Sequence, residues 1–418
     1  MARLWKKKLF FIFTGAFLLY ITVKWMLPIK TRVAETSLYR YVWMSEPPSV
    51  GEVNQERTER IHKVCTAKEK ELRGNKSRTD ISRHMHIDPK HKLTYCFLLK
   101  AGYTFWGLLF RIVRGDFNTT SPFDPAIFYR RGTPIASLGS LSHMQQALFF
   151  NNSFSFMLTR DPYSRLFSGY TDKLFMPNQH WYSVAPKITQ VARHRHQKCA
   201  SDIQFKEFIK YIIYSEEHRQ PRDLHYHFAF DFCDPCQYKY DFIGKLETIK
   251  QDTMYLLDKM NQTKVIENLE KDLRGQYINF TIKERIDHLF SSQKKILTCK
   301  ENFFQVQRKF WKGFQVYGII SKRSKYPVSE EKSHDITPEI FHDTVVKAIG
   351  DAADAEVSRR NKEEALLEAY STVETEDMEK LSRLLKPDCE VFGYDCRPSR
   401  LFKDRKYIKP WYFDITTA

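Results

Sequence analysis

An apolar run in this sequence stops abruptly at a charged segment that contains a proline. Residues 154–158 are mostly apolar, and Arg160, Asp161 and Pro162 follow before an amphipathic segment begins. Proline favours the first turn of a helix, where its missing N–H costs no hydrogen bond. We therefore predict a buried strand that leads directly into a helix, with Arg160 between them. This 154–170 junction is of a kind found in α/β folds.

The 154–170 junction is suited to binding an anion. The open N–H groups at a helix N-terminus and a nearby guanidinium both attract negative charge. Ser168 lies further along the same predicted helix. On geometry alone, a structural pair of Arg160 and Asp161 that only shapes the turn explains the pattern equally well.

A second apolar run, residues 93–99, precedes a loop of phosphate-binding type. Lys100 and Gly102 follow it, and Thr104 is the expected N-cap of a helix that contains Trp106. A strand, a Lys/Gly/Thr loop and a helix make up the physical device of a phosphate-binding loop. The Walker pattern G-x-x-x-x-G-K-[ST] does not occur in the sequence, which argues against an ordinary P-loop NTPase. Alone, this 93–106 junction is weak, because a Gly turn after a buried strand is common.

Together the two junctions resemble the PAPS-binding elements of Golgi carbohydrate sulfotransferases (PAPS is 3′-phosphoadenosine 5′-phosphosulfate). The resemblance is to the family of HNK-1, chondroitin 4-O, dermatan 4-O and GalNAc 4-O sulfotransferases. In that family a Pro-Lys-x-x-Cys-Ser/Thr-x-Trp loop holds the 5′-phosphosulfate, and an Arg-x-Pro-x-x-Arg-Leu-x-Ser-x-Tyr segment holds the 3′-phosphate. The second segment is matched here by Arg160, Pro162, Arg165, Leu166, Ser168, Tyr170 and Lys173.

The first of these family motifs is altered in this chain. Leu99 stands in place of the proline, Tyr103 in place of the cysteine, and Gly107-Leu108 in place of a basic pair. Because of these departures, an alternative interpretation is a catalytically weakened membrane protein that only binds PAPS or a sulfated glycan. A nucleotide kinase is a second alternative. The residues that the motif retains are Lys100, Gly102, Thr104 and Trp106.

Two further blocks strengthen the resemblance. His225-Tyr226 and residues 233–248 are similar to the family's His-Trp and Cys-x-Pro-Cys…Tyr-Asp-Phe-Ile/Val-Gly-Lys-x-Glu-Thr run, with Tyr226 in place of the tryptophan. Residues 389–394 resemble a terminal block of the family. Within the first block, residues 240–244 are expected to form another buried strand. The resemblance covers residues 57–300 and, locally, 386–395.

The resemblance implies an α/β fold, with a P-loop-like parallel sheet flanked by helices, that transfers a sulfuryl group from PAPS to a glycan hydroxyl. Lys100 is then the catalytic cation, and Arg160 with Ser168 holds the 3′-phosphate. His225 is the candidate base because histidine has a suitable pKa, with His227 as its local competitor and a purely structural role for His225 still open. No metal is implied. The loop expected to contact the cosubstrate consists of Lys100, Ala101, Gly102, Tyr103, Thr104, Phe105 and Trp106.

The acceptor implied is a hexosamine of chondroitin or dermatan, or an N- or O-glycan, carried in some cases on a proteoglycan. The sequence does not select among them. The formal net charge of +17 suits an acidic glycan, an anionic membrane or nucleic acid. A lumenal location argues against nucleic acid, and dispersed surface lysines account for part of the excess. Residues 193–198 are the densest basic cluster and a candidate groove for an acidic polysaccharide.

Residues 9–27 are almost wholly apolar and, at ~1.5 Å per residue, about 28 Å long, barely a bilayer core. Basic residues precede them, and no A-x-A-like cleavage site follows, which favours a signal anchor over a cleaved signal peptide. We expect a single-pass type II protein of the Golgi membrane. Its parts would be a cytoplasmic tail, 1–8, the anchor, 9–27, a stem, 28–56, and a lumenal sulfotransferase domain, 57–418.

The cysteine count fits an oxidising lumen. Eight cysteines permit full pairing, and we expect structural disulfides rather than zinc or redox chemistry at Cys233-x-x-Cys236. Five Asn-x-Ser/Thr sequons are consistent with a secreted glycoprotein. Within the domain, apolar residues of 203–213 form a helical stripe expected in the core. Residues 320–385 resemble the family least and are expected to be a charged helical insertion, with an exposed helix over 351–370.

Overall fold

The computed structural model divides the chain into two units, one ending at Val53 and one running from Asn54 to Ala418. The predicted tail, 1–8, and anchor, 9–27, lie outside the described residues. No helix within the described part of the chain is long and apolar enough to cross a membrane. The structure describes residues 48–74, 76, 80–124, 127, 134–299, 301–403 and 406–418.

The second unit is built on a four-stranded sheet in the order β1-β2-β3-β4. The three strands β2 (Leu93–Cys96), β3 (Phe154–Thr159) and β4 (Phe242–Lys245) are parallel, as predicted. The edge strand β1 (Met85–Asp88) pairs with β2 in the antiparallel direction, so the expected fully parallel sheet is wrong at this edge. The turn at 89–92 explains the difference, because so short a connection joins only antiparallel neighbours.

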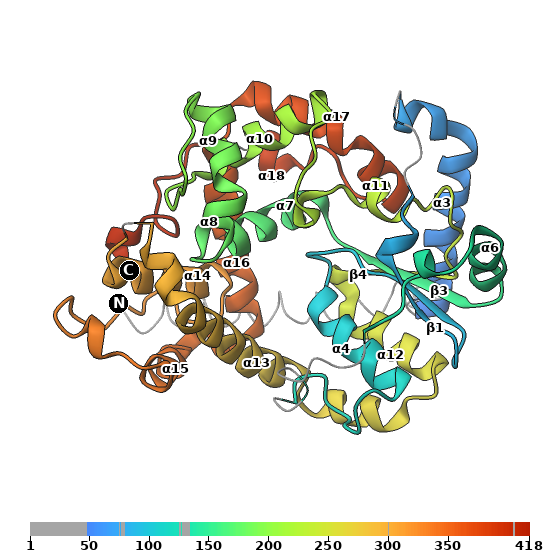
Figure 1. Ribbon diagram of the computed structural model, residues 1–418, viewed down its shortest axis with the longest axis horizontal. Coiled ribbons are helices and arrows are strands. Elements are labelled where there is room, and N and C mark those ends of the chain that lie inside the picture. Colours follow the sequence, from blue (N-terminus) through green and yellow to red (C-terminus); the bar gives the residue numbers. More distant parts are fainter. Residues whose placement is uncertain are drawn as a thin grey trace, which may run out of the picture. The chain divides into compact units, whose positions relative to one another are not determined.

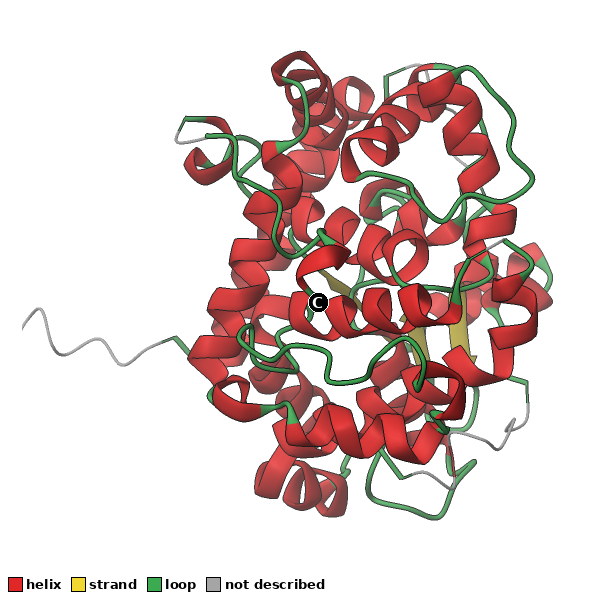
Figure 2. Ribbon diagram, turned by 90° about the vertical axis from the view of Figure 1, so that its left-hand side faces the viewer, coloured by secondary structure: helices red, strands yellow, loops and turns green. Residues whose placement is uncertain are grey.

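Helices cover this sheet and form most of the described chain (Figure 2). Two of them, α4 (Tyr103–Arg114) and α12 (Ile249–Lys259), lie side by side next to the strands (Figure 1). The Trp106 ring is completely buried there, packs edge-on against Phe156 of β3, and donates from Nε1 to Thr253 Oγ1 at 3.2 Å. This tryptophan therefore joins α4, α12 and the sheet.

The helix of the 154–170 junction is α7 (Pro162–Tyr170), and it begins where the sequence predicts. Pro162 is in the first turn, and the Asp161 carboxylate accepts a hydrogen bond from the Ser164 N–H at 2.8 Å, so Asp161 is the N-cap of the helix. After Tyr170 the helix continues into a π-helical turn, η3 (Thr171–Phe175). Such turns insert an extra residue and are frequent at functional sites.

The start of α4 differs from the prediction for Thr104. The N-cap is Gly102, with φ of 86°, and the exposed Thr104 lies inside the first turn. The chain reaches this point through a left-handed residue, Lys100, whose φ is 67°. Gly102 takes the cap position because it adopts a second left-handed conformation without steric cost.

The helical part of the unit has its own large core. The apolar residues of 203–213 are buried, as predicted, and those from Phe205 onward lie on α10 (Phe205–Glu217), whereas Ile203 precedes the helix. A helix forms over most of 351–370, as expected, but the expected exposure is wrong for its C-terminal half. The corresponding helix, α16 (Ala355–Ser371), contributes Ala365, Leu366, Ala369 and Tyr370 to the core. Their i, i+1, i+4, i+5 spacing forms an apolar stripe among many charged neighbours.

Four disulfides connect segments of the unit, confirming the expected structural pairing. Cys233 pairs with Cys96 of β2, whereas Cys236 pairs with Cys65 of α3 (Val50–Arg73). The C-x-x-C segment therefore joins two separate elements rather than forming a redox pair of its own. The other disulfides are Cys199–Cys299 and Cys389–Cys396.

The remaining helices complete the described part of the chain. Helix α3 includes residues 50–56 at the end of the predicted stem. The other α-helices are α6 (His143–Asn151), α8 (His180–Ser183), α9 (Ala185–Arg193), α11 (Ala229–Cys233), α13 (Thr263–Leu297, kinked at Asp272), α14 (Phe303–Val316), α15 (Pro338–Lys347), α17 (Thr375–Phe392) and α18 (Ser399–Phe402). The single-turn helices are η1 (Ser82–His84), η2 (Leu138–Ser140), η4 (Leu224–Tyr226), η5 (Leu246–Thr248), η6 (Ser333–Asp335), η7 (Gly350–Ala353) and η8 (Ile415–Thr417).

Candidate functional site

The sheet brings the two predicted anion-binding junctions together. Strands β2 and β3 are parallel neighbours, with Cys96 opposite Met157, so their carboxyl ends reach the same edge. Ligands of open α/β sheets bind beyond that edge. There the Arg160 guanidinium donates to the Lys100 carbonyl oxygen at 3.3 Å. The 93–106 and 154–170 junctions are therefore two sides of one site.

Lys100 points inward and pairs with a carboxylate. Its Nζ lies 2.7 Å from Asp172 Oδ2, and only 14% of the Lys100 side chain is exposed. Burial lowers the pKa of Lys100 to about 8, although the neighbouring Asp172 acts in the opposite direction. The predicted catalytic cation thus carries a positive charge that is poorly hydrated and held in place.

Asp172 forms ion pairs with three cations, and the sequence analysis did not predict a role for it. Besides Lys100 it binds Arg285 Nη1 at 2.8 Å and Lys173 Nζ at 3.2 Å. Burial opposes its ionisation, but these cations hold the pKa of Asp172 well below its usual range. Arg285 comes from α13 and also lies over the Tyr317 ring at 4.5 Å. A clue to Asp172 was its position beside Lys173, whereas Arg285 had no comparable motif.

Arg160 and Ser168 lie on the α7 side of the site. Burial lowers the pKa of Arg160, with Glu247 and Asp161 acting in the opposite direction. Ser168 is 9% exposed and follows Arg160 by two turns along α7. Arg160 contacts the loop that carries Lys100 through the Lys100 carbonyl oxygen.

The loop residues serve different purposes. A helix leaves the N–H groups of its first turn without an intrahelical acceptor, and in α4 these belong to Tyr103, Thr104 and Phe105. The Ala101 N–H donates to Leu98 O at 3.3 Å, and the Trp106 N–H donates to Gly102 O at 3.0 Å. The loop therefore offers the amides of the first turn to a ligand, while Trp106 anchors the helix.

Arg165 matches the sequence motif but is completely buried, with 1% of its surface exposed. It donates from Nη1 to Leu99 O at 3.4 Å and from Nη2 to His227 O. It thereby connects the donor loop with the segment that carries the candidate bases, and acts as a structural residue.

We expect Arg165→Met to lower the free energy of unfolding by roughly 2–4 kcal/mol, because both carbonyls lose a charged donor in a buried place. Urea denaturation measures the change. The exposed Arg195→Met is the matched control and should change stability by less than about 0.5 kcal/mol. Equal stabilities of the two variants would contradict the structural role.

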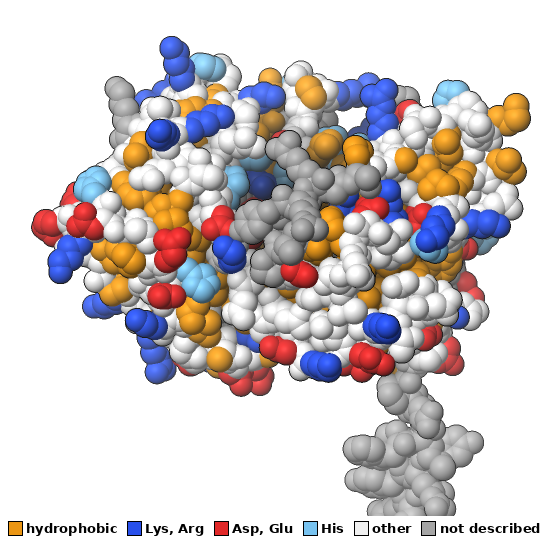
Figure 3. Space-filling view, turned by 60° about the horizontal axis from the view of Figure 1, so that its bottom comes forward, with side chains coloured by type: hydrophobic (Ala, Val, Ile, Leu, Met, Phe, Trp, Pro, Cys, Tyr) orange, Lys and Arg blue, Asp and Glu red, His pale blue; other side chains and the backbone are white. Residues whose placement is uncertain are grey.

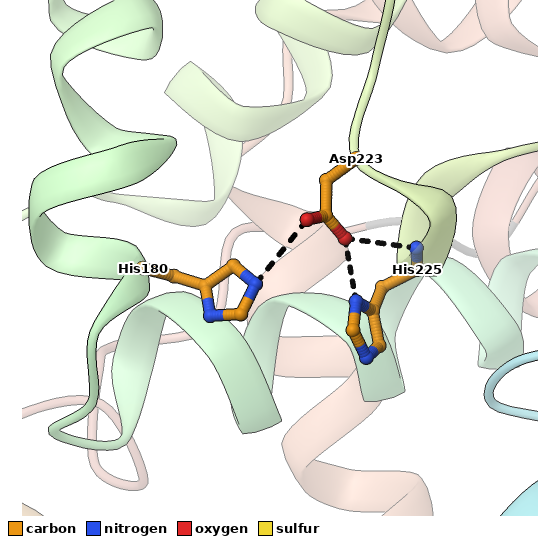
Figure 4. A group of neighbouring side chains, drawn as sticks. All are labelled: His180, Asp223 and His225. Carbon is orange, nitrogen blue, oxygen red and sulfur yellow. Dashed lines mark hydrogen bonds and ion pairs between the residues drawn. The ribbon is translucent and has the colours of Figure 1, made fainter. Parts of the chain in front are cut away.

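His225 of η4 is paired with a carboxylate at its Nδ1. Asp223 Oδ1 lies 2.5 Å from His225 Nδ1 and accepts the His225 N–H at 3.0 Å (Figure 4). In the neutral ring this places the proton on Nδ1 and leaves Nε2 as the basic atom. Burial lowers the pKa of His225, as do the charges of Lys173 and Lys100, while Asp223 opposes them. The positive charge of Lys100 therefore acts on the His225 ring.

His227, the other candidate base, has different partners. Its Nε2 lies 3.2 Å from the Arg222 carbonyl, its own carbonyl receives Arg165, and its ring packs edge-on against Phe232. The geometry thus favours His225 as the base. A further histidine, His180, lies 3.4 Å from Asp223 through Nε2 and was missed by the sequence analysis because it belongs to no recognised motif.

On the face in Figure 3, lysines and arginines are dispersed among acidic side chains. In the predicted 193–198 cluster, Arg193 binds Asp202 at 3.0 Å and Glu207 at 2.6 Å, so this arginine holds the fold together. His194, Arg195 and His196 are exposed. A glycan-binding role of the cluster stays a prediction.

Comparison with known proteins gives a family match over residues 83–317, to a model described as the sulfotransferase family. Carbohydrate sulfotransferase 10 of Xenopus laevis is 29% identical over 224 residues, which are 49% of this chain and 61% of that protein. Human carbohydrate sulfotransferase 9 is 29% identical over 188 residues, covering 43% and 41% of the two chains. Rat carbohydrate sulfotransferase 11 is 24% identical over 214 residues, covering 49% and 61%.

The matched region includes Lys100, Asp172 and His225. The chain spans less than two thirds of the length of these curated relatives. No solved structure matches it.

Proposed function

Because this chain belongs to the sulfotransferase family, we propose that it transfers the sulfuryl group of PAPS to a hydroxyl of a glycan. The observation that carries the proposal is the meeting of Lys100 and Arg160 at one edge of the sheet, with His225 within the electrostatic reach of Lys100. Lys100 and Arg160 touch through the Lys100 carbonyl, and Lys100 lies close enough to His225 to lower its pKa. A cation, an anion-binding arginine and a neutral base are the groups that this reaction requires.

In the proposed reaction the acceptor hydroxyl attacks the sulfur of PAPS in line. The new O–S bond forms as the bond between sulfur and the bridging oxygen breaks, and adenosine 3′,5′-bisphosphate (PAP) leaves. The hydroxyl proton passes to His225 Nε2, which Asp223 keeps available by holding the proton of the ring on Nδ1. Lys100 stabilises the negative charge that grows on the bridging oxygen, the electrostatic contribution that matters most in group transfer.

The donor is held by both junctions. The N–H groups at the start of α4 and Gly102 face the 5′-phosphate, since a helix N-terminus attracts an anion. Arg160 and Ser168 bind the 3′-phosphate, which distinguishes PAPS from ATP. Lys100 must then share its charge between Asp172 and the donor, and Arg285 and Lys173 remain to neutralise Asp172.

The proposed acceptor is a hexosamine of chondroitin or dermatan, or of an N- or O-glycan, and the proposed location is the Golgi lumen behind a type II anchor. The four disulfides support an oxidising compartment. A panel of desulfated glycans, assayed with the full chain, identifies the acceptor. The rate of labelled sulfate incorporation into each member is the quantity compared.

Arg160→Ala tests recognition of the 3′-phosphate. We expect its dissociation constant for PAP to rise by about 10–100-fold, because a charged hydrogen bond to phosphate is lost. Affinity for AMP, which has no 3′-phosphate, should change by less than about threefold. Isothermal titration calorimetry measures both, with the exposed Arg195→Ala as control. An equal loss for PAP and AMP would place Arg160 elsewhere on the nucleotide.

The pH dependence of kcat/KM should be bell-shaped. His225 must be neutral, and burial lowers its pKa from 6.5, so activity rises with pH through a value below 6.5. Lys100 must be charged, so activity falls as pH increases through about 8. The initial rate at subsaturating PAPS, measured across this range, checks both limbs. A profile that still rises above pH 9 would contradict the role of charged Lys100.

One alternative is a protein that binds PAPS or a sulfated glycan without efficient transfer. The departures at Leu99 and Tyr103 favour it, as does the ion pair that engages Lys100 with Asp172. PAP binding without any labelled sulfate transfer to the acceptor panel would support this alternative. A nucleotide kinase is the other, and it fails if ATP does not compete with PAPS for the site.

A further inference from the structure

Three side chains at the edge of the proposed acceptor site form a potential metal-ligand set. His180 of α8, and Asp223 and His225 around η4, place one ligand atom each within 4.8 Å of one another (Figure 4). His180 is buried, with 7% of its side chain exposed, and the other two are partly buried. Two imidazoles and one carboxylate are ligands that suit Zn²⁺ and its neighbours in the first transition row.

The surroundings of His180 fix which of its nitrogens faces the cluster. Asn178 donates from Nδ2 to Asp172 O at 2.7 Å and to Met176 O at 2.9 Å, so its Oδ1 must be the atom next to His180. That oxygen accepts the His180 backbone N–H at 2.8 Å and lies 2.9 Å from His180 Nδ1. Nδ1 therefore carries a proton.

In the neutral ring His180 Nε2 therefore has a lone pair, which faces Asp223 Oδ2 at 3.4 Å with no proton between them. Two electron-rich atoms in this arrangement are stabilised when a metal cation binds both. An imidazole whose other nitrogen donates to a carbonyl-type oxygen is the usual support of a metal-bound histidine.

The Asp223 carboxylate is also placed to take part in binding a cation. Its two carboxylate oxygens face different rings: Oδ1 lies 2.5 Å from His225 Nδ1, and Oδ2 lies 3.4 Å from His180 Nε2. Asp223 therefore places one carboxylate oxygen beside each histidine, where a cation bound by both rings would also meet the carboxylate.

We propose that His180, Asp223 and His225 bind one Zn²⁺ ion and that its binding inhibits sulfuryl transfer. The metal bonds to His225 Nδ1, whose proton moves to Nε2, and to His180 Nε2, which releases its proton to solvent if the ring is charged. His225 then presents an N–H instead of a lone pair to the acceptor. The binding stands on geometry alone, whereas the inhibition rests on the proposed function.

Zinc binding is measured first, by titrating the full chain with Zn²⁺ against a chromophoric chelator. We expect one site per chain that weakens by at least about 10–100-fold in His180→Ala, the range known for loss of supporting contacts. His194→Ala, in the exposed basic cluster, is the matched control for surface histidines and should keep the wild-type affinity. Asp223→Asn, which preserves side-chain size, should lose affinity like His180→Ala.

Inhibition is measured second, as the zinc concentration that halves each variant's own uninhibited rate. We expect zinc to lower kcat without raising the KM for PAPS, and the half-inhibitory concentration to rise in His180→Ala by the same factor as the dissociation constant. Unchanged zinc affinity in both His180→Ala and Asp223→Asn would overturn the site. Zinc binding at the site with full transfer would overturn the inhibition, and a protein that binds zinc but never transfers sulfate would refute the proposed function instead.

Discussion

Lys100→Ala should lower kcat/KM for sulfuryl transfer by about 10²–10³-fold or more. Lys100 is the cation proposed to stabilise the leaving bridging oxygen, and removing one preorganised group of this kind costs about that factor. The fold should survive, because Asp172 keeps Arg285 and Lys173 as partners. Initial rates with labelled PAPS and the preferred acceptor give the value.

Two controls separate chemistry from binding in this experiment. The affinity of Lys100→Ala for PAP should fall by less than about tenfold, since the Arg160 side of the donor site is intact. Lys90→Ala removes an exposed lysine from the turn after β1 and should retain wild-type rates. Transfer by Lys100→Ala within about threefold of the wild type would refute the catalytic role.

His225→Ala should reduce kcat by about 10²–10⁴-fold, the usual contribution of a positioned general base. Asp223→Asn should produce a smaller loss, because the base remains but its Nδ1 proton is no longer held by a charged acceptor. In both variants the acidic limb of the pH profile should be altered, which a purely structural change would not do.

His227→Ala is the decisive comparison for the identity of the base. His227 is engaged with Arg222 O and Phe232, so we expect a loss of kcat much smaller than in His225→Ala. If His227→Ala is inactive while His225→Ala is not, the base is His227 and the assignment made from Asp223 is wrong.

The parts of the fold that the sequence predicts are those with strong local signals. The apolar runs before Lys100 and Arg160 became β2 and β3, and Pro162 lies in the first turn of α7, because such preferences act over a few residues. Thr104 was misplaced as a cap because the left-handed turn at Gly102 starts the helix two residues earlier. The burial of α16 was hidden by its charged residues.

The parts of the site that were missed depend on contacts between distant segments. Asp172 binds Arg285 of α13, and His180 of α8 meets Asp223, which precedes η4, so each pair joins residues that are far apart in the sequence. Lys100 and His225 were found through motifs, but their electrostatic coupling emerges only when β2 and η4 are placed together. Local patterns identify such residues, whereas tertiary packing sets their protonation and partners.

The central claim is that this chain transfers a sulfuryl group, with Lys100 and His225 acting in one site. The most direct test incubates the full chain with doubly labelled PAPS and the acceptor panel, then quantifies sulfated glycan and PAP together. The account predicts one mole of sulfated sugar for each mole of PAP, with both products lost in Lys100→Ala and His225→Ala. PAP binding with no sulfated product from any acceptor, or unchanged product in both variants, would contradict it.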